Sequence, residues 1–309
     1  MRQWNHAIVI SALLIFSQLA CTSIEDKPEK AQSKPKTKQR FSTERAKVLQ
    51  FEGILNRCKV ANVFQPFVFF SLSHTEQSTV AFVHLNADLN NDYSRPNDEV
   101  LIAIDANAKL EYQPSSGERA STELRTGDVV QIPKGCGHKL SNQNTGHEHS
   151  LFLVVFPPGL VSLARDNPSF GANWGHFHEK KSATKVKKSI GVANTLIPAN
   201  VISIADASSQ STQKIETRKL SDSQLATVTA VNFKTNLKPH VHPRNDEIFI
   251  LLGGVGRFYL ESPSGGLTSH RLRRGSIVHV PTAVSHAFKL EEEGDDSVVL
   301  AIHTPRYSQ

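Results

Sequence analysis

The chain has 309 residues, of which 39% are hydrophobic and 21% are charged, and its formal net charge is +6. This composition is ordinary for a globular protein, and the length allows about two domains. Much of the formal net charge lies in two runs without interleaved aromatic residues, at 27–40 and 180–188. Runs of this kind are typical of solvated linkers and argue against nucleic acid as a partner.

Residues 1–21 have the features of a secretory signal. Arg2 precedes an apolar run from Ala7 to Ala20, which is shorter than the ~20 residues that a comfortable membrane span needs. Cys21 follows directly, as the lipidated cysteine does in bacterial lipoproteins, although Gln18 stands where such signals normally have Leu. We therefore expect export and attachment to the periplasmic face of a bacterial membrane through lipid on Cys21; cleavage to a soluble secreted form is the alternative.

Residues 22–48 are rich in Lys, Pro, Ser and Gln and have almost no large apolar side chains. Such a segment buries too little surface to fold, so it is predicted to be a disordered tether. Two further cysteines, Cys58 and Cys136, follow it. In an oxidising compartment they are free to pair, but the sequence does not give the distance between them.

The rest of the chain contains an internal repeat. A shift of 148 residues aligns the sequence with itself, without gaps, from Val83/Val231 to Pro157/Pro305. Apolar runs at 80–85, 100–104, 129–132 and 151–156 predict strands in the first copy, and counterparts recur in the second. We therefore predict two like domains, at 49–158 and 199–309. A connector at 159–198 joins them, and a connector of this length is expected to pack or to function.

The second copy carries a group of metal-binding side chains. They are His240, His242, Glu247 and His286. If His240 and His242 lie on one strand, their side chains leave it on the same face. Imidazole suits Fe, Ni, Cu and Zn, and a carboxylate suits Mn and Fe. This set predicts one divalent transition metal, with Fe(II) favoured and Mn, Ni, Cu or Zn as alternatives.

These residues occur in two motifs that resemble those of the cupin family. His240-Val-His242, four residues, Glu247, six residues and Gly254 resemble the first cupin motif. Gly275, five residues and Pro281-Thr-Ala283-Val-Ser-His286 resemble the second, with Ala283 where the family usually has Gly. The resemblance implies an all-β fold of two tandem cupin barrels of the double-stranded β-helix or jelly-roll type. It also implies that the second barrel carries the intact metal site.

The first copy keeps Glu99 and His138, but Asp92-Tyr93-Ser94 replaces the paired histidines. One interpretation is a structural or substrate-accommodating barrel, in which the buried Glu99 and His138 need each other or another hydrogen-bonding partner. The alternative is a second metal site formed by Asp92, Glu99 and His138.

The resemblance implies a metal-dependent enzyme of the dioxygenase type that acts on a small oxygenated organic substrate, with Glu247 as a catalytic ligand. Lyase, decarboxylase and sugar isomerase activities are alternatives within the family, and a non-catalytic metal-binding or ligand-binding lipoprotein is an alternative outside catalysis. We name Lys238, His279 and Phe249 as candidates for substrate binding. If the strand from Asn236 to His242 is regular, Lys238 shares the inward face with the histidines, although it could instead extend to water. His279 could support the site from beside it or be an exposed residue. The globular part is expected to be monomeric or to form a homodimer.

Overall fold

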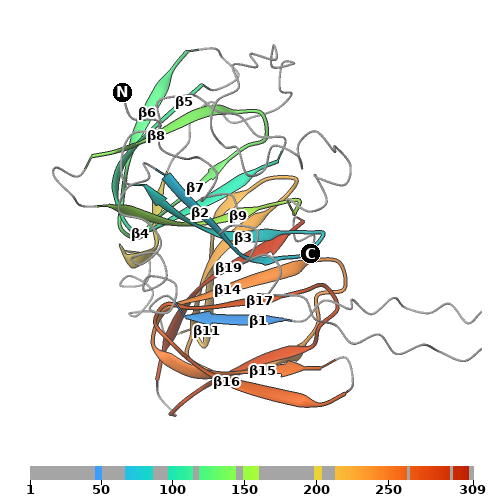
Figure 1. Ribbon diagram of the computed structural model, residues 1–309. Helices are drawn as coiled ribbons and strands as arrows, with labels where there is room; N and C mark the ends of the chain where they lie inside the picture. The colour runs from blue at the N-terminus through green and yellow to red at the C-terminus, as the bar shows by residue number, and fades with distance from the viewer. Residues whose placement is uncertain are drawn as a thin grey trace, which may run out of the picture. The chain divides into compact units, whose positions relative to one another are not determined.

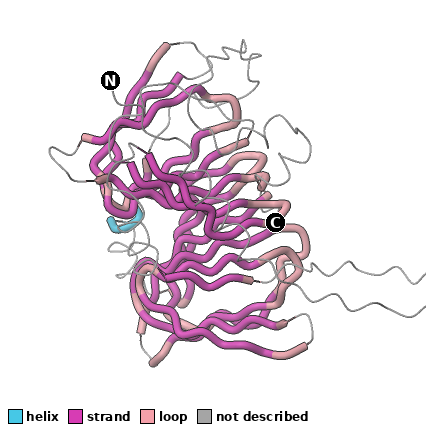
Figure 2. The backbone as a smooth tube through the Cα atoms, in the orientation of Figure 1, coloured by secondary structure: helices cyan, strands magenta, loops and turns pink. Residues whose placement is uncertain are grey.

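The computed structural model describes residues 46–50, 67–85, 97–113, 118–143, 149–159, 198–203, 213–262, 265–292 and 295–305. Nearly all of the regular structure in these ranges is strand, and only residues 201–203 form a helical turn (Figure 2). The signal segment, Cys21, Cys58, Asp92-Tyr93-Ser94 and nearly all of the connector lie outside the described residues. No helix in the described part of the chain is long and apolar enough to cross a membrane.

The first barrel is made of two antiparallel sheets (Figure 1). The larger has the order β10-β7-β4-β9-β3-β2. Its strands are β2 (Phe67–His74), β3 (Thr79–Leu85), β4 (Glu99–Asp105), β7 (Asp128–Ile132), β9 (Ser150–Phe156) and β10 (Ala199–Asn200). The smaller has the order β6-β5-β8, with strands β5 (Asn107–Gln113), β6 (Ala120–Arg125) and β8 (Gly137–Asn142). The four strands predicted in this copy are therefore confirmed as β3, β4, β7 and β9.

The second barrel repeats this plan. Its larger sheet has the order β1-β17-β14-β19-β12-β11. The strands are β1 (Lys47–Gln50), β11 (Ile215–Asp222), β12 (Thr227–Phe233), β14 (Asp246–Gly253), β17 (Ser276–Val280) and β19 (Ser297–Thr304). The smaller sheet has the order β13-β18-β15-β16, with strands β13 (Leu237–His240), β15 (Val255–Glu261), β16 (Leu267–Arg273) and β18 (His286–Leu290). The fold is all-β, with two tandem barrels of the cupin type, as predicted.

The two barrels exchange their first strands. β1 precedes the first barrel in the sequence but pairs with β17 of the second, where Gln50 lies opposite Ser276. β10 precedes the second barrel but pairs with β7 of the first, where Asn200 lies opposite Asp128. Figure 1 shows β1, in blue, beside the orange strands of the second barrel. The exchange shifts the domain boundaries drawn from the sequence, because periodicity identifies a strand but not the sheet to which it adds.

Burial explains the two kinds of strand pattern. In β15 buried and less buried residues alternate, because one face packs inside the barrel and the other faces outward. All seven residues of β3 and all five of β17 are buried. These strands have apolar side chains on both faces: one face lines its own barrel, and the other joins a core shared by both barrels. This shared core includes Phe82 and Leu153 of the first barrel and Ile250, Ile277 and Leu300 of the second.

Candidate metal centre

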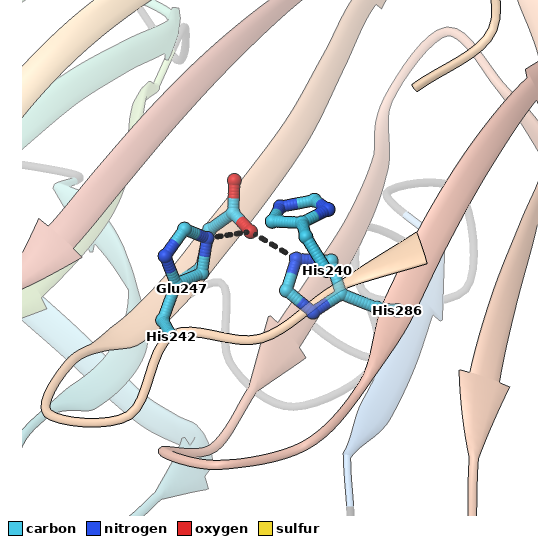
Figure 3. A group of neighbouring side chains, drawn as sticks. All are labelled: His240, His242, Glu247 and His286. Atoms are coloured by element: carbon cyan, nitrogen blue, oxygen red, sulfur yellow. Dashed lines mark ion pairs between the residues drawn. The ribbon is translucent and has the colours of Figure 1, made fainter. Parts of the chain in front are cut away.

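Three neighbouring segments of the second barrel bring the predicted ligands together. His240 ends β13, Glu247 is the second residue of β14, and His286 begins β18 directly opposite His240. His242 lies in the loop between β13 and β14. One potential ligand atom from each of these four residues lies within 4.8 Å of the others. Figure 3 shows the three imidazoles gathered around the Glu247 carboxylate.

The spacing within the group fits a coordination sphere. Glu247 Oε2 lies 2.7 Å from His286 Nε2 and 3.3 Å from His242 Nε2. Neighbouring ligand atoms of an octahedral ion with bonds of about 2.1 Å are about 3.0 Å apart. Two of the rings also have a fixed tautomer: His240 Nδ1 donates to the Lys238 carbonyl over 2.9 Å, and His286 Nδ1 donates to the Val284 carbonyl over 3.0 Å. These bonds orient the opposite nitrogen, Nε2, as a ligand.

Burial and neighbouring charges have opposite effects on the pKa values of Glu247 and His286. Burial alone would raise the pKa of Glu247, but His242 and His286 hold it well below its ordinary value. Burial lowers the pKa of His286, but the Glu247 carboxylate outweighs this effect and leaves it raised. Without a cation the carboxylate therefore favours a protonated His286. A metal ion would take the place of that proton, so metal binding is coupled to proton release.

Phenylalanine side chains form the surroundings of this group inside the barrel. The Phe258 ring stacks on the His286 ring, with centroids 5.7 Å apart and planes 7° apart. Phe249 and Phe288 pack next to it, with centroids 5.2 Å apart. His286 is 2% exposed, whereas His240 is only half-buried. Approach to the group is therefore from the side of His240, because the opposite side is filled by the apolar core.

A further histidine, His303, lies beside the group and was not predicted from the sequence. It sits on β19 opposite Glu247, and its Nε2 is 3.8 Å from Glu247 Oε1. Its ring is 4.8 Å from that of His242, and burial lowers its pKa. Alternation along β19 could have placed His303 on the inner face with Val299 and Ala301. The pairing of β19 with Glu247 could not be read from the sequence.

The internal repeat shows why His303 escaped notice. With the 148-residue shift, His303 aligns with Val155, a residue of the shared core. In the structure Val100 lies opposite Val155, so Glu99 faces Phe156, whereas Glu247 faces His303. The true offset across these last strands is therefore 147 residues. The ungapped match is wrong by one residue there, which exchanges the two faces of the strand.

The three candidates for substrate binding lie in different surroundings. Phe249 is 1% exposed and faces the barrel interior, on the same face of β14 as Glu247. Lys238 is exposed. The expected alternation from Asn236 to His242 fails because the pairing of β13 with β18 is irregular between Leu237 and His240.

His279 is 1% exposed and lies at the contact between the barrels rather than at the surface. Its Nδ1 is 2.8 Å from Ser73 Oγ, and its Nε2 is 2.8 Å from Ser78 Oγ. Both serines belong to the first barrel. His279 is therefore engaged by the neighbouring barrel and is not placed among the four ligands.

In the first barrel the remaining pair is buried and in contact. His138 Nε2 is 3.6 Å from Glu99 Oε1, and both side chains are at most 2% exposed. Cys136 is a buried free thiol, and Cys58, its candidate partner, lies outside the described residues. Among the described residues, only the group in the second barrel brings three or more metal-ligating side chains together.

Fold and site together define a two-barrel β protein, with one candidate metal centre among the described residues. The family model described as "Cupin" matches residues 194–309. An uncharacterized protein of Aquifex aeolicus (strain VF5) is 32% identical over 97 residues, which are 31% of this chain and 74% of that protein. Residues 194–309 therefore match the cupin family, and the described fold is of the cupin type.

Solved structures show the same fold. A cupin 2 conserved barrel domain protein from Leptotrichia buccalis is 14% identical, with a TM-score of 0.54, over 84% of this chain and 96% of that chain. A structure of oxalate decarboxylase, described for an element that modulates proton-coupled electron transfer, is 15% identical, with a TM-score of 0.50, over 85% of this chain and 74% of that chain. At these identities the likeness concerns the fold alone.

Proposed function

We propose that the second barrel is the catalytic centre of a metal-dependent enzyme, of the oxygenase type, that acts on a small oxygenated organic substrate. The observation that carries this proposal is the convergence of three imidazoles and one carboxylate within 4.8 Å. Four protein ligands around a six-coordinate ion leave about two positions open, and open positions distinguish catalytic from structural metal sites. Fe(II) is the favoured ion, and Mn, Ni, Cu and Zn are the alternatives.

A metal bound there supplies Lewis acidity and, if it is redox-active, a means of activating dioxygen. The protein's own part is to hold and shield the reactants. Glu247 offsets part of the charge of the ion, and the Lys238 and Val284 carbonyls keep the His240 and His286 rings in place. The phenylalanine side chains exclude water from the inner side of the site, where low polarity strengthens electrostatic interactions. The half-buried His240 leaves the outer side for a small substrate.

Oxygen consumption tests this proposal directly. Protein loaded with Fe(II) is mixed with a panel of phenols, diketones, thiols and hydroxy acids, and dissolved oxygen is followed. The same panel is run without oxygen for decarboxylation, elimination and isomerisation, because a Lewis acid serves those reactions as well. Turnover in the aerobic panel supports the oxygenase assignment, and turnover only in the anaerobic panel replaces it with a Lewis-acid enzyme.

The matched variant is Glu247→Gln, which removes the charge with little change of shape. It should lower the rate more than it lowers ligand affinity. Tight ligand binding without turnover in either panel, unaffected by Glu247→Gln, would replace the enzyme with a non-catalytic binding protein. We further propose that the protein is exported and anchored through Cys21, which the sequence of the first 21 residues supports.

A further inference from the structure

Asp246 precedes the ligand Glu247 and connects the segments that carry the other ligands. It is 1% exposed. Its Oδ1 accepts hydrogen bonds from Thr282 N over 2.8 Å and from Thr282 Oγ1 over 2.9 Å. The next residue, Ala283, donates its N–H to the His242 carbonyl over 2.8 Å. The turn that leads into His286 is thus tied both to the Glu247 strand and to the loop that carries His242.

The other oxygen of Asp246 is held by the first barrel. Thr75 Oγ1 donates to Oδ2, and Ser78 Oγ donates to it over 2.8 Å. Both residues lie at the turn between β2 and β3, about 170 residues away in the sequence. Donors from the first barrel therefore fix this oxygen, together with His279 of its own barrel, whose Nε2 lies 3.4 Å away.

A reciprocal contact exists on the other side of the interface. Asp98 of the first barrel accepts hydrogen bonds from Lys134 N over 2.8 Å and from Ser223 Oγ of the second barrel. Asp98 and Lys134 correspond to Asp246 and Thr282 by the 148-residue shift, and Ser223 corresponds to Thr75. This second contact supports a barrel whose only described ligand-type pair is Glu99 and His138. The Asp98–Ser223 contact is therefore a control for the Asp246–Thr75 contact, because it joins the same two barrels without supporting the four candidate ligands.

We propose that Asp246 is a positioning residue for the metal centre and that the first barrel sets the geometry of this centre through Thr75 and Ser78. The role rests on the proposed metal function. A carboxylate with five hydrogen-bonding contacts to two barrels has little freedom. Its rigidity passes to Glu247 through the chain and to His286 through the turn at Thr282. Groups that orient metal ligands in this way typically change metal affinity by roughly 10–100-fold when they are removed.

The test uses the full-length protein and Co(II) alone as the probe. The affinity for Co(II) is measured by competition, and the visible spectrum is recorded. The variants are Thr75→Val, Ser78→Ala and the double variant. Ala is compatible with this turn, since Ala226 holds the corresponding position in the second barrel. Two variants serve as controls. Thr75→Ser keeps the hydroxyl group, and Ser223→Ala removes the reciprocal contact with Asp98. We expect the double variant to bind Co(II) about 10-fold more weakly or worse, with an altered spectrum, and Ser223→Ala and Thr75→Ser to match the wild type.

Each outcome decides one question. A wild-type protein that binds no Co(II) refutes the metal function itself. A wild type that binds while the folded double variant stays within about twofold of it refutes the positioning role and leaves the metal function standing. Equal losses in the double variant and in Ser223→Ala would reduce the contact to general stabilisation of the interface. Should the double variant fail to fold, Ser78→Ala alone carries the same comparison.

Discussion

Ala283 provides a sharp test of how the ligand-bearing turn is built. Its φ is 65°, in the left-handed region, whereas the corresponding residue of the first barrel is Gly135, with φ of 78°. The left-handed conformation costs a non-glycine residue about 1–2 kcal/mol. Glycine in turn costs about 0.4–1 kcal/mol through the greater freedom of the unfolded chain. Ala283→Gly should therefore stabilise the protein by about 0.8 kcal/mol, which corresponds to a rise in Tm of about 2 °C.

The measurement is denaturant unfolding and thermal melting with a chelator present, so that metal binding does not contribute. Gly135→Ala is the control, because it introduces into the first barrel the strain that the second tolerates, and it should destabilise by a similar or larger amount. Co(II) affinity should not change, since the N–H of residue 283 still donates to the His242 carbonyl. Destabilisation by Ala283→Gly, or no effect of Gly135→Ala, would refute the reasoning.

Four further predictions concern the site, the first barrel and the N-terminus. His286→Ala should reduce bound metal from about one equivalent per chain to nearly none, whereas His138→Ala should lower stability and leave metal content unchanged. Metal content is measured by elemental analysis, and two equivalents in the wild type would contradict a single site. His303→Gln should weaken metal binding by roughly tenfold or less, and a loss as complete as that of His286→Ala would make His303 a ligand. Burial and the neighbouring His149 lower the pKa of His84 to about 4, so the contribution of His84 to stability is complete above pH ~6.5 and is lost as the pH falls toward 4. His84→Asn should therefore lose less stability than the wild type in melts across this window. Labelling of the full-length protein with a radioactive fatty acid should disappear in Cys21→Ser, and export without any labelling would mean a secreted protein.

The metal group could be predicted because its information is local. Two short motifs fix the residue types, and the repeat shows that the surrounding barrel occurs twice. What the sequence could not give is long-range pairing. His303 meets Glu247 only because β19 adds beside β14 in a particular register, and a one-residue change of that register would turn the imidazole away from the barrel interior.

The surroundings of two candidate residues for substrate binding also could not be predicted from the sequence. His279 reads from the sequence as a polar residue near the second motif, but Ser73 and Ser78 of the first barrel engage it. Lys238 reads as a neighbour of the histidines on a regular strand, but β13 is irregular at this point. For His279, contacts with the other barrel determine the surroundings of the side chain. For Lys238, an irregularity in the strand breaks the alternation on which the prediction depended.

The exchange of β1 and β10 has a consequence for how the protein can be handled and how it must fold. A cut in the connector would leave β1 with the first barrel and β10 with the second, so each barrel would lose the strand that completes its own sheet. Each fragment would then expose an unpaired sheet edge and its own side of the shared core. Neither barrel can therefore be produced alone, with the connector as its boundary, and keep all the strands of its larger sheet. The segment that precedes the first barrel finds its place only when the second barrel has been made, so completion of the native state must wait until the C-terminal half is available.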